Sequence, residues 1–164
     1  ADAERKVANM CLSLIAKYPN RHEIINELIQ ISVEELMHFR QVHELILYRG
    51  DTLNGKFQKD PYIKGLLSIV RSDSELLFMD RLIIASVAEL RGSERFKLIG
   101  ETIEDKKIAK FYLNLHKQEL EHIDAFIKMA KVYFKDELVD KRVDEILEQE
   151  AKVTASLPWR SAIH

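Results

Sequence analysis

One short pattern occurs twice in this chain of 164 residues and constrains its fold more than any other feature. The segments Glu35-Leu-Met-His38 and Glu119-Leu-Glu-His122 both have the form Glu-x-x-His. Each has a further glutamate upstream at almost the same separation, because Glu4 lies 31 residues before Glu35 and Glu89 lies 30 residues before Glu119. Positions i and i+3 of a helix share a face, so each unit can aim a carboxylate and an imidazole at one point. The repeat therefore predicts a four-helix bundle that holds two metal ions between its helices.

The spacing of apolar residues predicts helices throughout the chain and no strand. The expected helices are Asp2–Lys17, His22–Tyr48, a short one from Pro61 to about Arg71, one from Ser72-Asp73-Ser74 to about Ile99, one from Ile103 or Glu104 to Phe134, and one from about Glu137 to Ala155. Gly50 is expected to cap the second helix, and Gly100 to follow the fourth. Residues 51–60 are predicted to form a polar loop, and the last segment, SLPWRSAIH, to be irregular.

The order of these helices predicts an all-α, ferritin-like four-helix bundle. Two helical pairs are joined by residues 51–74, and this long connection must cross the bundle, as it does in ferritin-like topologies. No linker divides the chain, so we predict a single domain over residues 1–164. Its core would span about 1–134, and the charged helix and tail at about 135–164 would pack outside the bundle.

The six residues of the repeat lie on otherwise apolar helical stripes. These stripes are Glu4, Val7, Cys11 and Leu14; Leu28, Ile31, Glu35, His38, Val42 and Leu45; Phe78, Leu82, Ala85, Glu89, Gly92 and Phe96; and Ile108, Phe111, Leu115, Glu119, His122, Phe126 and Met129. Glu4 lies closest to the start of the chain, where the helix should fray unless upstream residues or a metal hold it. Neighbouring acids and histidines fall off the stripes and are rejected as ligands: Glu34, His43, Glu94, His116, Glu121 and Asp124.

Four carboxylates and two imidazoles are costly to bury as bare charges, and two divalent cations would neutralise them. A single Glu-x-x-His is usually a solvated pair, but two on apolar faces with matched upstream glutamates are not expected by chance. The donor set suits Mn²⁺ or Fe²⁺ better than a thiolate-bound structural Zn²⁺. We expect Glu4 and His38 to be terminal ligands of one metal and Glu89 and His122 of the other. Glu35 and Glu119 would bridge, and two irons could supply electrons to O2.

Composition excludes several other classes of protein. The net charge is -2 with a pI near 6.3, so no overall positive field indicates nucleic-acid binding. Cys11 is the single cysteine, which rules out a disulfide framework and makes a thiol enzyme a weak alternative. No stretch approaches about 18 uninterrupted apolar residues, and no signal peptide is evident. We expect a cytoplasmic protein.

Four segments resemble a known family: ANMCLSLIAKYPN, EELMHFRQVHELILYRG, AELRGSERF and FYLNLHKQELEHIDAF. They are similar to the tRNA 2-methylthio-N6-isopentenyladenosine hydroxylases, which are non-haem di-iron monooxygenases. The resemblance spans Ala1 to about Phe134 and continues more weakly through the last helix. Its more specific pieces are E-E-x-x-H-F at Glu34–Phe39 and E-x-R-x-x-E-R-F at Glu89–Phe96.

The resemblance implies that Glu4, Glu35, His38, Glu89, Glu119 and His122 bind two iron ions. It also implies that O2 and electrons from an external reductase hydroxylate the isopentenyl side chain of the modified adenosine beside a tRNA anticodon. The partner would be the anticodon loop, and the protein a monomer or small homo-oligomer. The chain departs from the family in having few residues before Glu4 and a mildly negative charge. Candidate phosphate contacts are Lys56, Lys59, Lys64, Arg91, Arg95 and Lys97.

Two other functions fit a ferritin-like di-metal bundle. One is a different oxidoreductase, such as a small-molecule oxidase or a rubrerythrin-like peroxidase, although such peroxidases usually add a Cys-x-x-Cys iron module that one cysteine cannot form. The other is a non-enzymatic iron-binding or storage bundle, which would be expected to assemble into a large closed shell.

Overall fold

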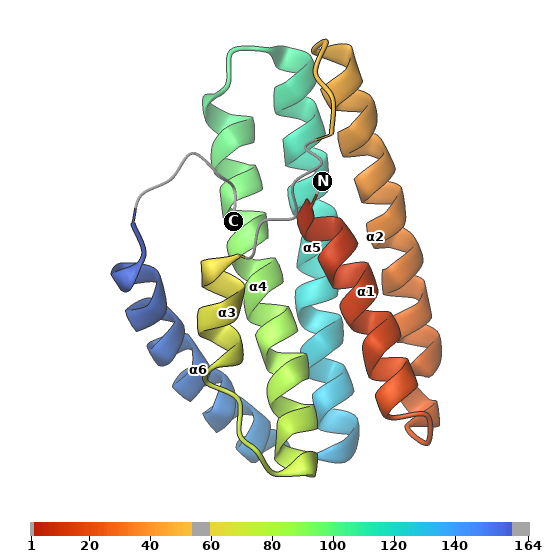
Figure 1. The fold of residues 1–164 in the computed structure, drawn as a ribbon, viewed down its shortest axis with the longest axis vertical. Helices are drawn as coiled ribbons and strands as arrows, with labels where there is room; N and C mark the ends of the chain where they lie inside the picture. The colour runs from red at the N-terminus through yellow and green to blue at the C-terminus, as the bar shows by residue number, and fades with distance from the viewer. Residues whose placement is uncertain (1, 54–59, 159–164) are drawn as a thin grey trace. The chain divides into compact units, whose positions relative to one another are not determined.

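The computed structural model describes residues 2–53 and 60–158, and every regular element in these ranges is an α-helix (Figure 1). This confirms the predicted all-α class for the part of the chain described. Contacts divide the chain into two compact units, residues 1–57 and residues 58–164. The single domain over residues 1–164 remains a prediction.

The first unit is a helical hairpin of α1 (Asp2–Lys17) and α2 (His22–Tyr48), whose bounds are those expected from the sequence (Figure 1). Ser32 ties the two helices together, because its hydroxyl lies 2.8 Å from the Leu28 carbonyl and 3.4 Å from the Ala8 carbonyl. Ala8 is buried whereas Val7 is only half-buried, so the buried stripe of α1 passes through Ala8 rather than Val7.

Gly50 ends α2 as predicted. Its φ of 77° lies in the left-handed region that favours glycine. In this conformation the Gly50 amide donates to the Leu47 carbonyl at 3.0 Å, and the Asp51 amide donates to the Ile46 carbonyl at 3.1 Å. These bonds use carbonyls that the end of the helix would otherwise leave without partners.

The second unit contains α3 (Pro61–Leu67), α4 (Ser74–Thr102), α5 (Lys106–Tyr133) and α6 (Asp136–Ser156). An aspartate precedes each of the first three helices as its N-cap. The side chains of Asp60, Asp73 and Asp105 accept hydrogen bonds from backbone amides of the first turn. Helices α4 and α5 form a long antiparallel pair, and α6 packs against both α3 and α4 (Figure 1).

Three predicted boundaries in this unit are wrong by a few residues. Helix α3 ends at Leu67 rather than near Arg71, because the Ile69 carbonyl accepts from Arg142 and the Arg71 amide donates to Asp80. Helix α4 continues through Gly100 to Thr102, whose hydroxyl donates to the Leu98 carbonyl at 2.7 Å. Helix α5 consequently begins later than expected, at Lys106.

Small residues seven positions apart on α4 let α5 approach closely. The Ser86 hydroxyl donates to the Ile123 carbonyl at 3.0 Å, and the Ser93 hydroxyl lies 2.6 Å from His116 Nδ1. At Gly100 a Cβ atom would lie only 2.7 Å from Leu113 Cγ. The two helices are therefore held along their length by short side-chain contacts on both sides of Glu89.

Parts of two predicted segments fall outside the described residues. These are residues 54–59 of the predicted polar loop, which include Lys56 and Lys59, and residues 159–164 of the predicted irregular tail.

Candidate metal centre

The second unit brings together three of the six predicted ligands. Glu89 comes from α4, and Glu119 and His122 come from α5. Each offers one ligand atom, and these atoms all lie within 4.8 Å of one another. All three side chains are buried. His122 Nδ1 lies 3.1 Å from Glu119 Oε2, so the imidazole and carboxylate of this Glu-x-x-His unit meet as the spacing predicted.

The first unit carries the other three predicted ligands. Glu4 lies in the first turns of α1, and Glu35 and His38 lie in the middle of α2. All three are buried, including Glu4 at 4% exposure. His38 Nδ1 lies 3.5 Å from Glu35 Oε1. Both Glu-x-x-His units thus place the same histidine nitrogen beside the glutamate three residues earlier.

The donors in the second unit fit a divalent metal ion. Two carboxylates and one imidazole, all buried, are the oxygen and nitrogen ligands that Fe²⁺ and Mn²⁺ accept. Burying two carboxylates side by side is costly unless a cation compensates their charge. A divalent metal ion would compensate this charge.

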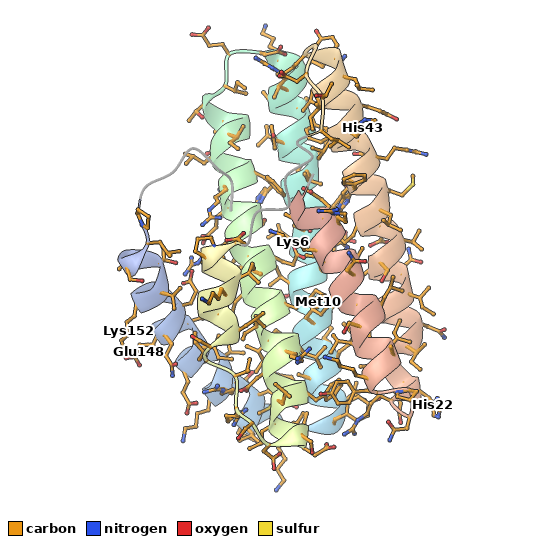
Figure 2. All side chains as sticks on the ribbon, in the orientation of Figure 1. Lys6, Met10, His22, His43, Glu148 and Lys152 are labelled. Carbon is orange, nitrogen blue, oxygen red and sulfur yellow. The ribbon has the colours of Figure 1, made fainter. Side chains whose placement is uncertain are left out.

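The residues rejected from the sequence occupy other environments. Glu94 is 55% exposed and pairs with Arg91 at 2.8 Å, while Glu121 and Asp124 are exposed. Glu34 is half-buried and accepts from Gln30. His43 is half-buried on α2 (Figure 2), and His116 is held by Ser93.

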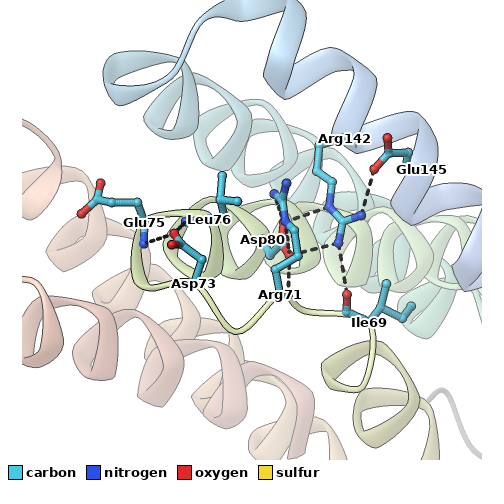
Figure 3. Close-up of polar contacts among 8 residues, drawn as sticks. All are labelled: Ile69, Arg71, Asp73, Glu75, Leu76, Asp80, Arg142 and Glu145. Carbon is cyan, nitrogen blue, oxygen red and sulfur yellow. Dashed lines mark hydrogen bonds and ion pairs between the residues drawn. The ribbon is translucent and has the colours of Figure 1, made fainter.

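Two buried ionic clusters were not predicted. In the first, Asp80 of α4 is fully buried and accepts hydrogen bonds from Arg71 and from Arg142 of α6 (Figure 3). Burial alone would raise the pKa of Asp80, but the hydrogen bonds from Arg142 and Arg71 hold it below its usual value. Arg142 also donates to Glu145 and to the Ile69 carbonyl.

The second cluster surrounds Glu150 of α6, which is 1% exposed. Arg91 donates to both of its carboxylate oxygens, at 3.1 and 2.9 Å, and the hydroxyls of Tyr62 and Thr154 donate to Oε1. Burial and the Glu150 charge raise the pKa of Tyr62. Burial would raise the pKa of Glu150 itself, but the Arg91 guanidinium lowers it overall. No sequence motif signalled either cluster, because the contacts that join α6 to Tyr62, Asp80 and Arg91 link residues 59 to 88 positions apart along the chain.

These contacts change the expected roles of some basic residues. Arg91 is committed to Glu150 and Glu94, so its selection as a phosphate contact is not supported by its surroundings. The Arg95 guanidinium lies 5.6 Å from the centre of the Tyr62 ring. Lys64 and Lys97 are exposed.

Comparison with known proteins places the chain in a family. The sequence model of the protein family described as tRNA-(MS[2]IO[6]A)-hydroxylase (MiaE) matches residues 1–164 of this chain. The chain belongs to this family. The resemblance identified from the four sequence segments is thereby confirmed.

Two relatives carry the name tRNA 2-(methylsulfanyl)-N(6)-isopentenyladenosine(37) hydroxylase. The one from Pseudomonas putida is 33% identical over 132 residues, which cover 80% of this chain and 63% of the relative. The one from Salmonella typhimurium is 31% identical over 113 residues, which cover 69% of this chain and 41% of the relative. The chain thus spans less than two thirds of the length of either relative.

A solved structure shares the fold of this MiaE-family chain. It is described as a Synechococcus protein with aldehyde deformylating oxygenase activity, and the TM-score is 0.89 over 98% of this chain and 78% of that chain. At 24% identity the likeness concerns the fold alone, and it confirms the predicted ferritin-like class. Among the helices of the described residues, none combines the length and apolar character that a membrane crossing needs.

Proposed function

We propose that this MiaE-family chain is a di-iron monooxygenase that hydroxylates the isopentenyl side chain of 2-methylthio-N6-isopentenyladenosine in tRNA. The observation that carries the proposal is the meeting of Glu89, Glu119 and His122 in a buried group within a chain of this family. The names of the two relatives support the substrate class. As a tRNA-modifying enzyme it would act in the cytoplasm on the anticodon loop.

The proposed ligand set has one half in each unit. Glu4, Glu35 and His38 would hold one iron, and Glu89, Glu119 and His122 the other. The repeated burial and the repeated approach of histidine to glutamate in the two halves support this assignment. When bound, the iron pair supplies the redox chemistry with O2.

The chain's own residues have two tasks in this reaction. The six ligand side chains hold the metal ions, and the apolar residues one turn away exclude water. Ile31 precedes Glu35 by four positions, and Leu115 precedes Glu119 by four; both are 1% exposed. Overall, the substrate C–H bond, O2, two electrons and two protons give a C–OH group and water, with the electrons supplied by an external reductase.

The test is a reaction of purified protein with Fe²⁺, a reductant, O2 and tRNA that carries the isopentenyl modification. Nucleoside mass spectrometry should detect the gain of one oxygen atom. Glu119→Ala should abolish product and metal binding, because it removes a buried ligand. Glu121→Ala is the matched control, since it removes an exposed glutamate two residues away on the same helix.

Other outcomes would favour the other functions. Iron-dependent O2 consumption with no change in the tRNA would indicate an oxidase or peroxidase that acts on a small molecule. A large closed shell in light scattering would indicate iron storage. Equal metal content in the wild type and in Glu119→Ala would contradict the assignment of the ligands.

A further inference from the structure

The cluster around Glu150 includes Arg91, which lies close in sequence to the proposed metal ligand Glu89. Arg91 follows Glu89 by two positions on α4. Its Nε and Nη2 atoms donate to the two carboxylate oxygens of Glu150 on α6. The Arg91 side chain is 30% exposed, whereas Glu150 is 1% exposed. Glu150 on α6 is therefore the buried member of this ion pair, and Arg91 is the partly exposed one.

A second ion pair joins α4 and α6 nearer the beginning of both helices. Asp80 and Arg142 pair at 2.9 Å, and both are almost fully buried. Along α4 the order is acid then base, Asp80 and Arg91, and along α6 it is base then acid, Arg142 and Glu150. A displacement of α4 by one turn, about 5.4 Å, would break both pairs. Buried ionic groups are best known for selecting one register in this way.

Helix α3 packs against both α4 and α6 (Figure 1), and it carries a residue of the Glu150 cluster. From it, the Tyr62 hydroxyl donates to Glu150 at 3.1 Å, and the Tyr62 ring packs under the Arg95 guanidinium. Thr154 donates to the same carboxylate at 2.9 Å. Glu150 thus accepts from two hydroxyls and one guanidinium, and its position is set by three separate contacts.

We infer that Glu150, acting through Arg91, is a positioning residue that holds Glu89 opposite Glu119 and His122. Metal ligands must stay within about 0.5 Å of their productive positions. Only Leu90 separates Glu89 from the anchored Arg91, so rotation or sliding of α4 at Arg91 moves Glu89 with it. Helix α6, which the sequence suggested was an accessory, becomes part of the metal centre's support. The inference rests on the proposed function in that Glu89 binds metal.

The test measures binding of Mn²⁺ alone, by competition with a chromogenic chelator, alongside thermal unfolding of the apoprotein. Glu150→Gln removes the charge of the anchor and should weaken metal affinity about 10-fold, as loss of a ligand's support typically does. Glu148→Gln is the matched control: Glu148 is 72% exposed on the outer side of α6, paired with Lys152 (Figure 2), and its loss should change nothing.

Two further variants separate positioning from stability. Asp80→Asn also removes a buried carboxylate charge that binds arginine, but Asp80 is nine residues from Glu89, so the change should lower the unfolding temperature with a smaller loss of metal affinity. The double change Arg91→Met with Glu150→Leu should recover part of the lost stability, since an apolar pair can replace a buried ion pair although the Tyr62 and Thr154 hydroxyls lose their acceptor. Metal binding should stay weak.

The outcomes are distinct. A wild type that binds no Mn²⁺ overturns the proposed function and the inference with it. A wild type that binds, together with Glu150→Gln or the double variant binding equally tightly, overturns the inference alone. A loss of affinity that follows only the loss of stability across all variants also overturns it, because Glu150 would then act on folding alone.

Discussion

The buried carboxylates Asp80 and Glu150 have different partners from the proposed metal ligands Glu89 and Glu119. Both are buried and both accept hydrogen bonds from arginine, whereas Glu89 and Glu119 meet a histidine and each other. All four side chains are carboxylates, but Asp80 and Glu150 lie beside arginine, whereas Glu89 and Glu119 lie beside His122. An arginine partner indicates a structural carboxylate, and a cluster of carboxylates with histidine indicates a metal ligand.

Asp80→Asn is expected to lower the free energy of unfolding by about 3–5 kcal/mol, because it removes the buried carboxylate charge that binds Arg142 and Arg71. Urea unfolding at neutral pH measures this change. Glu145→Gln is the control, since Glu145 binds the same arginine but is 44% exposed. Equal effects of the two changes would contradict the importance of burial.

The same pair predicts a dependence on pH. The pKa of Asp80 is lower in the folded state than in the unfolded chain, so its contribution is complete above the unfolded pKa. It is lost as the pH falls below about 4 and through the folded pKa. Acid unfolding followed by circular dichroism should show this loss in the wild type and a smaller one in Asp80→Asn. A parallel loss in both proteins would indicate that other carboxylates dominate.

At the scale of helices, the close approach of α4 and α5 depends on Gly100. Its replacement by alanine would favour a helix by about 1 kcal/mol. The new Cβ, however, would lie 2.7 Å from Leu113 Cγ and 3.1 Å from the Ala109 carbonyl oxygen. Overpacking of this kind costs about 1–3 kcal/mol. We therefore expect Gly100→Ala to destabilise the protein, as measured by thermal unfolding.

Leu113→Ala combined with Gly100→Ala provides the control, because it removes the side chain that the new Cβ meets. The double variant should lose less stability than the two single losses added together. Simple additivity would mean that the two positions do not interact.

Gly50 is a different case, since nothing lies within 4 Å of the Cβ that alanine would add. Its φ of 77° is the reason for glycine at this position. Gly50→Ala should cost about 1–2 kcal/mol through backbone strain alone, measured by urea unfolding. Gly50→Asn should cost less, because asparagine tolerates the left-handed region. Equal losses would point to a side-chain contact instead.

Most helix boundaries followed from the sequence, and the errors have physical causes. The bounds of α1 and α2 are set by local signals, the Tyr18-Pro19-Asn20 turn and Gly50. The end of α3 is set by Arg142, which lies 73 residues away from the Ile69 carbonyl that it binds. Local patterns cannot indicate such a partner.

At the scale of the whole molecule, we expect metal to couple the two units. The proposed ligands come from both, so Fe²⁺ or Mn²⁺ binding should raise the unfolding temperature and give one cooperative transition for the whole chain. A metal at about 100 times its dissociation constant would add about 2.7 kcal/mol of stability. Differential scanning calorimetry with and without metal measures both effects.

Glu119→Ala should abolish the rise in unfolding temperature, whereas Glu121→Ala should retain it. Two separate transitions with metal present would contradict the predicted single domain.

The sequence by itself determined the helical class, the family and the six candidate metal ligands. These depend on spacing along single helices and on local resemblance. A period of three or four residues fixes which side chains share a face, whatever the helix packs against. Tertiary structure decided which buried carboxylates meet histidine and which meet arginine. That choice depends on contacts between residues far apart in the chain, such as Asp80 with Arg142 and Glu150 with Arg91, which no local pattern encodes.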